Sequence, residues 1–220
     1  MTVAKPTPPP SEAAAHAVAR GGAYEDEGSG DRVVHHRYTD PLDLIWIAAA
    51  RRMGMQVQRS DAVFASWDGA RVLTLSTPEG FDPDDSVAQL VLHECCHALV
   101  EDARAWGSPD WGLENTDDRD LSAEHAAQRV QAALATPHGL RTFLAATTKW
   151  RDHYDSLPPN PLEGPASDPA VALAQAAFAR AQRPPWGPAL QDALHATAAV
   201  AAATRSFASA ESLWSVVPAC

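Results

Sequence analysis

Residues 87–101 read VAQLVLHECCHALVE and contain the motif His93-Glu94-x-x-His97. In a helix, two histidines four residues apart lie one turn apart, so both imidazoles point to the same spot and Glu94 projects beside them. This arrangement offers a zinc ion two nitrogen ligands with a carboxylate next to them. The stretch therefore predicts a helix that binds a metal.

The residues around the motif are apolar on nearly every side of this helix. One apolar face comprises Val87, Val91, Cys95, Ala98 and Leu99, and Leu90 and Val100 make the opposite side apolar as well. A helix with this pattern is buried, yet it carries ionisable residues along one stripe. Buried ionisable groups are costly unless they are paired or bound to a metal. The context therefore favours a metal site over a purely structural pair of histidines.

A zinc site needs a third protein ligand. Glu101 lies eight residues after His93, about 12 Å along the helix axis, so it is better explained as an outer contact or a solvated helix end. Glu124 lies on the flank of the core-facing side of the next predicted helix, from where it can reach the motif. Asp120 occupies the same flank and is the rival ligand, whereas His125 points away from the core. The alternative for Glu124 is a solvated carboxylate in the first turns of a helix.

The motif and the segment 124–137, EHAAQRVQAALATP, together resemble the gluzincin-type metallopeptidases of the ImmA/IrrE family. The resemblance covers residues 40–137 and implies a zincin-like fold, with His93, His97 and Glu124 as zinc ligands and Glu94 as the general base. It places Gln128 where related families have a residue that orients a ligand. The chain departs from the family pattern at Cys95, Cys96 and Val130.

A second resemblance is to the elongation factor P hydroxylases, because Asp110-Trp111-Gly112 follows the HExxH motif as an aromatic-Gly loop. It implies Fe²⁺ in place of Zn²⁺, held by the same two histidines and a carboxylate, and oxygen chemistry on a protein. A third possibility is a zincin-like scaffold that binds a partner without turnover, through its Ala-rich C-terminal helices.

As a peptidase, the site would leave one metal position for water, and the ion would lower the pKa of that water until Glu94 takes its proton. The carbonyl oxygen of the substrate then needs a hydrogen-bond donor, for which His153 and Tyr154 have the right chemistry. A solvated pair after Trp150 is the plainer explanation of these two residues. We expect strand 71–76 to be the edge that binds an extended protein or peptide substrate.

Composition indicates which partners and which cellular compartment to expect. The net charge of −11 argues against nucleic acid or an anionic membrane as partner. No apolar run is long enough to span a bilayer, and the N-terminus has no apolar signal region. Three cysteines without framework spacing favour a reducing cytoplasm. The Ala-rich, Arg-rich composition suggests a bacterial source.

The pattern along the chain predicts an α+β fold, in which a small antiparallel three-stranded sheet packs on the motif helix and the ligand helix. We expect a disordered tail over 1–30, the metal-binding domain over 31–157 and a helical extension over 158–220. The expected helices are 41–53, 82–102, 117–135, 139–149, 169–182 and 187–206, and the expected strands are 55–59, 62–66 and 71–76, the last two joined by a hairpin turn at 67–70.

Overall fold

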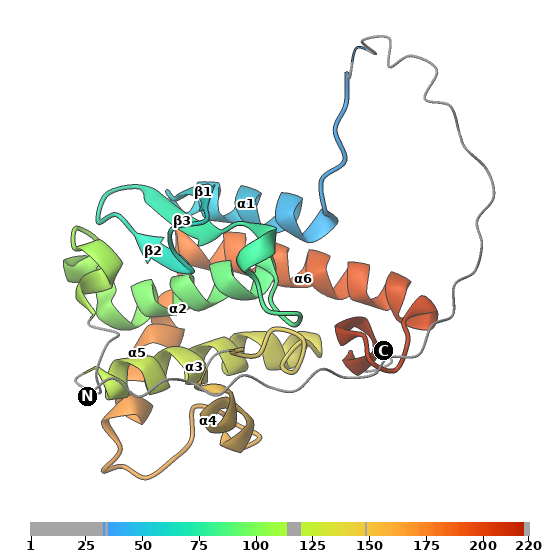
Figure 1. Ribbon diagram of the computed structural model, residues 1–220. Helices are drawn as coiled ribbons and strands as arrows, with labels where there is room; N and C mark the ends of the chain where they lie inside the picture. Colours follow the sequence, from blue (N-terminus) through green and yellow to red (C-terminus); the bar gives the residue numbers. More distant parts are fainter. Residues whose placement is uncertain (1–32, 34, 114–119, 148, 218–220) are drawn as a thin grey trace, which may run out of the picture. The chain divides into compact units, whose positions relative to one another are not determined.

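The computed structural model describes residues 33, 35–113, 120–147 and 149–217. From Thr39 onward these residues form one compact unit (Figure 1). Its regular elements are α1 (Pro41–Arg52), β1 (Gln56–Ser60), β2 (Ala65–Trp67), β3 (Val72–Ser76), α2 (Val87–Ala105), α3 (Leu121–Ala135), α4 (Arg151–Ser156), α5 (Pro169–Ala181) and α6 (Trp186–Thr204), with short 3₁₀ turns that include η2 (Pro109–Gly112). The α+β class predicted from the sequence is confirmed.

Helix α1 begins as its sequence predicts. The Asp40 side chain accepts a hydrogen bond from the backbone N–H of Leu42 at 2.8 Å, and Pro41 occupies the first helical position, where no N–H is needed. The buried face of α1 includes Trp46, whose indole N–H donates to the Thr197 hydroxyl at 2.9 Å. This hydrogen bond ties α1 to α6.

The sheet has the order β1-β3-β2 and is mixed, so the predicted all-antiparallel sheet is wrong. Strand β2 pairs with β3 antiparallel, but β1 pairs with β3 in parallel. The reason lies in burial: Leu73 and Leu75 of β3 are fully buried, which suits the central strand, whereas the polar β1 suits an edge. The prediction that strand 71–76 is an edge is therefore also wrong, because the edges are β1 and β2.

The predicted hairpin between β2 and β3 is confirmed, but β2 covers Ala65–Trp67 and not residues 62–66, so Trp67 belongs to the strand and not to the turn. One carboxylate oxygen of Asp68 accepts hydrogen bonds from the backbone N–H groups of Ala70, Arg71 and Val72 at 2.7, 2.8 and 2.9 Å. Gly69 has φ +76°, a left-handed conformation that glycine adopts without strain. Side-chain hydrogen bonding and glycine together close this turn.

Two helix predictions need correction. Helix α2 begins at Val87, capped by Ser86, and not at residue 82, because residues 82–85 form a turn closed by a hydrogen bond from Asp82 N–H to the Asp85 side chain. No helix occupies 139–147 in the described chain: Gly139 turns left-handed with φ +68°, and α4 begins only at Arg151. The first residues of the helix expected over 117–135 lie partly outside the described residues.

Helices α5 and α6 contribute to the same hydrophobic core as the motif helix. Helix α5 packs against α3 and α2, and α6 packs against α1. In Figure 1 the sheet and α1 lie on one side of α2 and α3 lies on the other. The motif helix is thus surrounded by structure, which explains why it is apolar on so many sides. Among the described helices, none combines the length and the apolarity that crossing a bilayer requires.

Candidate metal centre

The packing of α2 against α3 brings His93, His97 and Glu124 together. The two histidines lie on one face of α2, and Glu124 lies in the first turns of α3. One ligand atom from each residue falls within 4.8 Å of the others. The set that the sequence predicts as metal ligands is therefore a real cluster in the fold.

The spacing of these atoms fits a tetrahedral ion. The two Nε2 atoms are 3.1 Å apart, His97 Nε2 is 3.3 Å from Glu124 Oε2, and His93 Nε2 is 3.7 Å from Glu124 Oε1. Ligands about 2.05 Å from a tetrahedral zinc ion lie about 3.4 Å from one another. The two histidine distances run to different oxygens of Glu124, and the spacing of the three side chains is compatible with a bound metal ion.

The electrostatics of the cluster keep it charged. Burial alone would raise the pKa of Glu124, but the hydrogen bond from His97 and the charges of both histidines hold that pKa well below its usual range. Burial likewise works to lower the pKa of His97, and the hydrogen bond and charge of Glu124 outweigh it, so the pKa of His97 is raised. Metal binding requires an ionised carboxylate and a neutral imidazole, so an ion at this site would replace the proton on His97.

Two glutamines of α3 hold the ligands in place. Gln128 donates from Nε2 to Glu124 Oε1 at 2.8 Å, which is the orienting contact that its position predicts. Gln131 accepts from His93 Nδ1 at 2.8 Å and donates to the Leu144 carbonyl oxygen at 2.6 Å. This contact keeps a proton on His93 Nδ1, so that Nε2 presents its lone pair to the cluster. Gln131 was not predicted, although it continues the polar stripe of Glu124 and Gln128 along an otherwise alanine-rich helix.

Glu94 is held beside the cluster by Trp111. The indole N–H of Trp111 donates to Glu94 Oε2 at 2.9 Å. Trp111 itself is buried and stacks on Trp67 of β2, with ring centroids 4.5 Å apart and planes within 5°. Both Asp110 and Trp111 have left-handed backbones, with φ +47° and +61°, which is costly for residues other than glycine. These contacts fix one oxygen of the Glu94 carboxylate.

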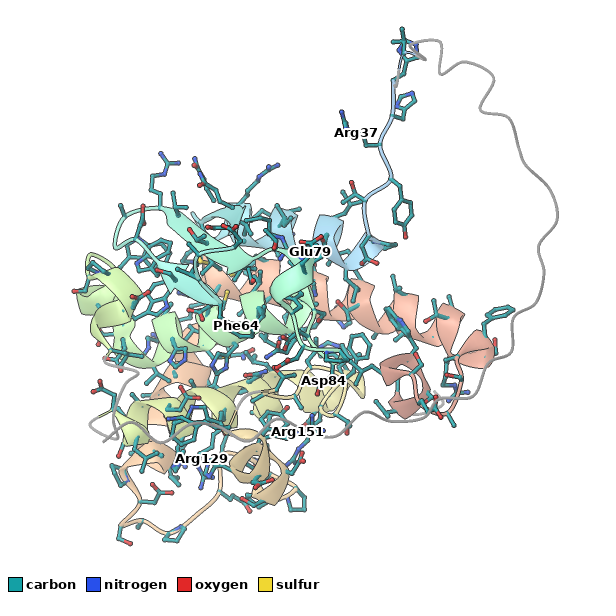
Figure 2. All side chains as sticks on the ribbon, viewed as in Figure 1. Arg37, Phe64, Glu79, Asp84, Arg129 and Arg151 are labelled. Atoms are coloured by element: carbon teal, nitrogen blue, oxygen red, sulfur yellow. The ribbon has the colours of Figure 1, made fainter. Side chains whose placement is uncertain are left out.

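A pocket of about 350 Å³ opens over the cluster. Its floor is His93, Glu94, His97 and Glu124, and its walls are largely apolar, with Phe64 and Leu90 among them. Phe64, labelled in Figure 2, lies beside α2 next to the start of β2. The site thus combines a polar floor with a cleft that a substrate chain can enter.

The remaining predicted residues lie elsewhere. Asp120 lines the pocket but does not belong to the ligand cluster, and Glu101 lies two turns beyond His93 on α2. Tyr154 is buried and its hydroxyl donates to the Arg141 carbonyl oxygen at 2.8 Å, while His153 stacks on His125. Neither lines the pocket, so the structure does not support them as transition-state donors.

Cys95 and Cys96 are both buried, and burial raises the pKa of each thiol above its usual range. A protonated thiol is a poor ligand and a poor nucleophile. Neither sulfur belongs to the ligand cluster.

Comparison with protein-family models, with curated proteins and with solved structures gives no match to this chain. The chemistry of the site therefore rests on its own geometry.

Proposed function

We propose that this protein is a zinc-dependent metallopeptidase that hydrolyses peptide bonds of a protein or peptide substrate. The observation that carries the proposal is the convergence of His93, His97 and Glu124, with one ligand atom of each within 4.8 Å of the others and the Glu94 carboxylate held beside them. Three protein ligands leave a fourth position of a tetrahedral ion free, which is the pattern of catalytic zinc sites.

A zinc ion in this site would supply a Lewis acid that lowers the pKa of water and polarises the substrate carbonyl. Glu94 takes the proton of the attacking water and then delivers it to the departing amine. Water adds across the scissile C–N bond, so the atoms balance without an oxidant or reductant. Gln131 and Gln128 keep His93 and Glu124 from rotating away during the reaction.

The test compares metal content and hydrolysis in two variants. Glu124→Ala removes a ligand and should lose zinc, whereas Glu94→Gln keeps every ligand and should retain zinc while hydrolysis of a peptide mixture falls by at least about 100-fold. Plasma emission spectrometry measures the metal, and mass spectrometry measures the products. Unchanged zinc in Glu124→Ala, or full hydrolysis in Glu94→Gln, would contradict the proposal.

One observation favours a second function, a non-haem iron hydroxylase. The Asp110-Trp111-Gly112 loop, which carries the resemblance to elongation factor P hydroxylases, contacts Glu94 directly through Trp111. In that case the ligands would hold Fe²⁺, and Glu94 would act as an outer contact instead of a base. Iron in the purified protein together with oxygen-dependent turnover would favour this function over hydrolysis.

A further inference from the structure

The outer edge of strand β2 offers backbone N–H and C=O groups to a substrate beside the pocket. In the antiparallel pair with β3, Phe64 accepts from Ser76 N–H and Asp68 donates to the Val72 carbonyl, so residues 64, 66 and 68 face β3. Alternation along a strand then turns the N–H and C=O groups of Ala65 and Trp67 outward. Ala65 also lines the pocket over the metal ligands.

Only one of these two residues has both backbone groups available. The Trp67 N–H donates to Asp110 Oδ1 at 2.9 Å. In the described part of the chain, the Ala65 N–H and C=O make no hydrogen bond. Beside the pocket, a substrate can therefore pair with the backbone of Ala65, but the backbone N–H of Trp67 is already bonded.

The element that prevents further pairing is η2, which lies where a substrate strand would continue past Trp67. Trp111 stacks on the Trp67 ring. The β2–β3 turn also rests closely on this segment: a Cβ on Gly69 would lie 2.8 Å from Pro109 N and 2.9 Å from the carbonyl carbon of Ser108. Contacts at three points hold η2 against β2, so this end of the cleft is closed.

Ala65 supports antiparallel pairing with a substrate. An antiparallel pair places both hydrogen bonds of Ala65 on one substrate residue, whereas a parallel pair needs a further substrate residue on the Trp67 side, where η2 lies. In an antiparallel pair, the substrate residues that lie towards Trp67 are those nearer its amino terminus. The closed end of the cleft therefore faces the amino-terminal part of the substrate.

The closed end is also acidic. Asp110 lies there, and its Oδ1 holds the Trp67 N–H. A carboxylate at the blocked end of a peptide cleft complements the positive charge of a free α-amino group.

We propose that the protein removes residues from the free amino terminus of peptides, because η2 occupies the strand-pairing position beside Trp67 and so limits how many residues can precede the scissile bond. The inference rests on the proposed peptidase function and narrows its substrate class. Peptide pairing at Ala65 provides the affinity, and Asp110 selects an unblocked amino terminus.

The test uses the full chain loaded with zinc and a mixture of octapeptides of random sequence, supplied with free or acetylated amino termini. Mass spectrometry locates the cuts. We expect cuts near the amino terminus and a rate at least about tenfold lower for acetylated peptides. Asp110→Asn keeps an acceptor for Trp67 N–H but removes the charge, so it should lose the preference for free termini and still cut near the end.

Asp110→Ala removes the acceptor as well, and should allow cuts further along the octapeptides. Cuts spread evenly along the peptides by the wild-type protein, or equal rates for free and acetylated peptides, would overturn the inference and leave the peptidase proposal standing.

If no peptide is hydrolysed, the peptidase proposal fails. A binding measurement then tests separately whether peptides dock at Ala65. In zinc-loaded Glu94→Gln protein, a free tetra-alanine amide should shift the backbone amide signal of Ala65 in a ¹⁵N–¹H spectrum, and its acetylated form should bind at least about tenfold more weakly. No shift at Ala65 with the free peptide would refute docking at this edge.

Discussion

Gln131 is the residue whose replacement tests the architecture of the centre most directly. Its carboxamide makes two hydrogen bonds in a fully buried position, one accepted from His93 Nδ1 and one donated to the Leu144 carbonyl oxygen. Gln131→Leu preserves the bulk and removes both. His93 then loses the contact that fixes its tautomer, and the Leu144 carbonyl is left unpaired.

Two magnitudes follow from these contacts. Loss of an outer partner of a metal-binding histidine lowers metal affinity by about 10- to 100-fold. An unpaired buried carbonyl costs about 1–3 kcal/mol of folding free energy. Zinc affinity is measured by competition with a chromophoric chelator, and stability by urea unfolding of the metal-free protein. The affinity is compared at a temperature at which both proteins are folded.

Gln89→Leu is the matched control. Gln89 lies on α2, one turn before His93, and is as deeply buried, but its Oε1 has no hydrogen-bond partner among the described residues. The same substitution there removes an unsatisfied polar group and should leave zinc affinity unchanged. Gln131→Glu retains an acceptor for His93 Nδ1 and should bind zinc more tightly than Gln131→Leu. Wild-type affinity in Gln131→Leu would refute the positioning role.

Three further predictions concern the charge pair, the base and the core. In the metal-free protein, the lowered pKa of Glu124 stabilises the fold at pH values above 4.5, the pKa of this carboxyl in the unfolded chain. The raised pKa of His97 stabilises the fold at pH values below 6.5, the pKa of this imidazole in the unfolded chain. The stability advantage over Glu124→Gln should therefore be greatest between these values and shrink as pH rises through the raised pKa of His97; urea midpoints across pH that show a constant difference would contradict this. Trp111→Phe removes the N–H that orients Glu94, so kcat should fall by about tenfold and KM should change less. Equal changes of kcat and KM in steady-state kinetics would argue against an orienting role. Trp46→Phe leaves the Thr197 hydroxyl without its indole donor and should cost about 1–3 kcal/mol in thermal unfolding.

Local patterns in the sequence predict much of this fold because their physics is local. Asp40 and Pro41 start α1 through contacts within three residues, and Asp68 with Gly69 closes a turn on itself. The HExxH spacing fixes two ligands on one helix face. The helical period of α3 places Glu124 on the flank of the buried face but leaves Asp120 as a rival, and the family resemblance favours Glu124.

One error has a local cause, and the others arise where distant residues compete. Residues 82–85 have the composition of a helix start, yet the Asp85 side chain accepts a hydrogen bond from Asp82 N–H and closes a turn. Helix α2 begins only after Ser86, which caps it. The strand order depends on which strand is buried on both sides, and β1 and β3 are joined in parallel although β2 lies between them in sequence. The role of Gln131 depends on Leu144, which reaches it only after the chain has turned at Gly139.

The charged cluster between α2 and α3 supports the functional proposal on grounds of stability. Glu124 and His97 are buried, and neighbouring positions of both helices are apolar. Buried charges recover little of the free energy lost on leaving water, and apolar residues of similar size are often as stable or more so. The cluster is nevertheless supported by Gln128, Gln131 and the left-handed backbone at Trp111, each of which fixes one side chain of the site. A chain that needed only a stable core gains little from these contacts, whereas in a metal site they orient the ligands and the neighbouring carboxylate.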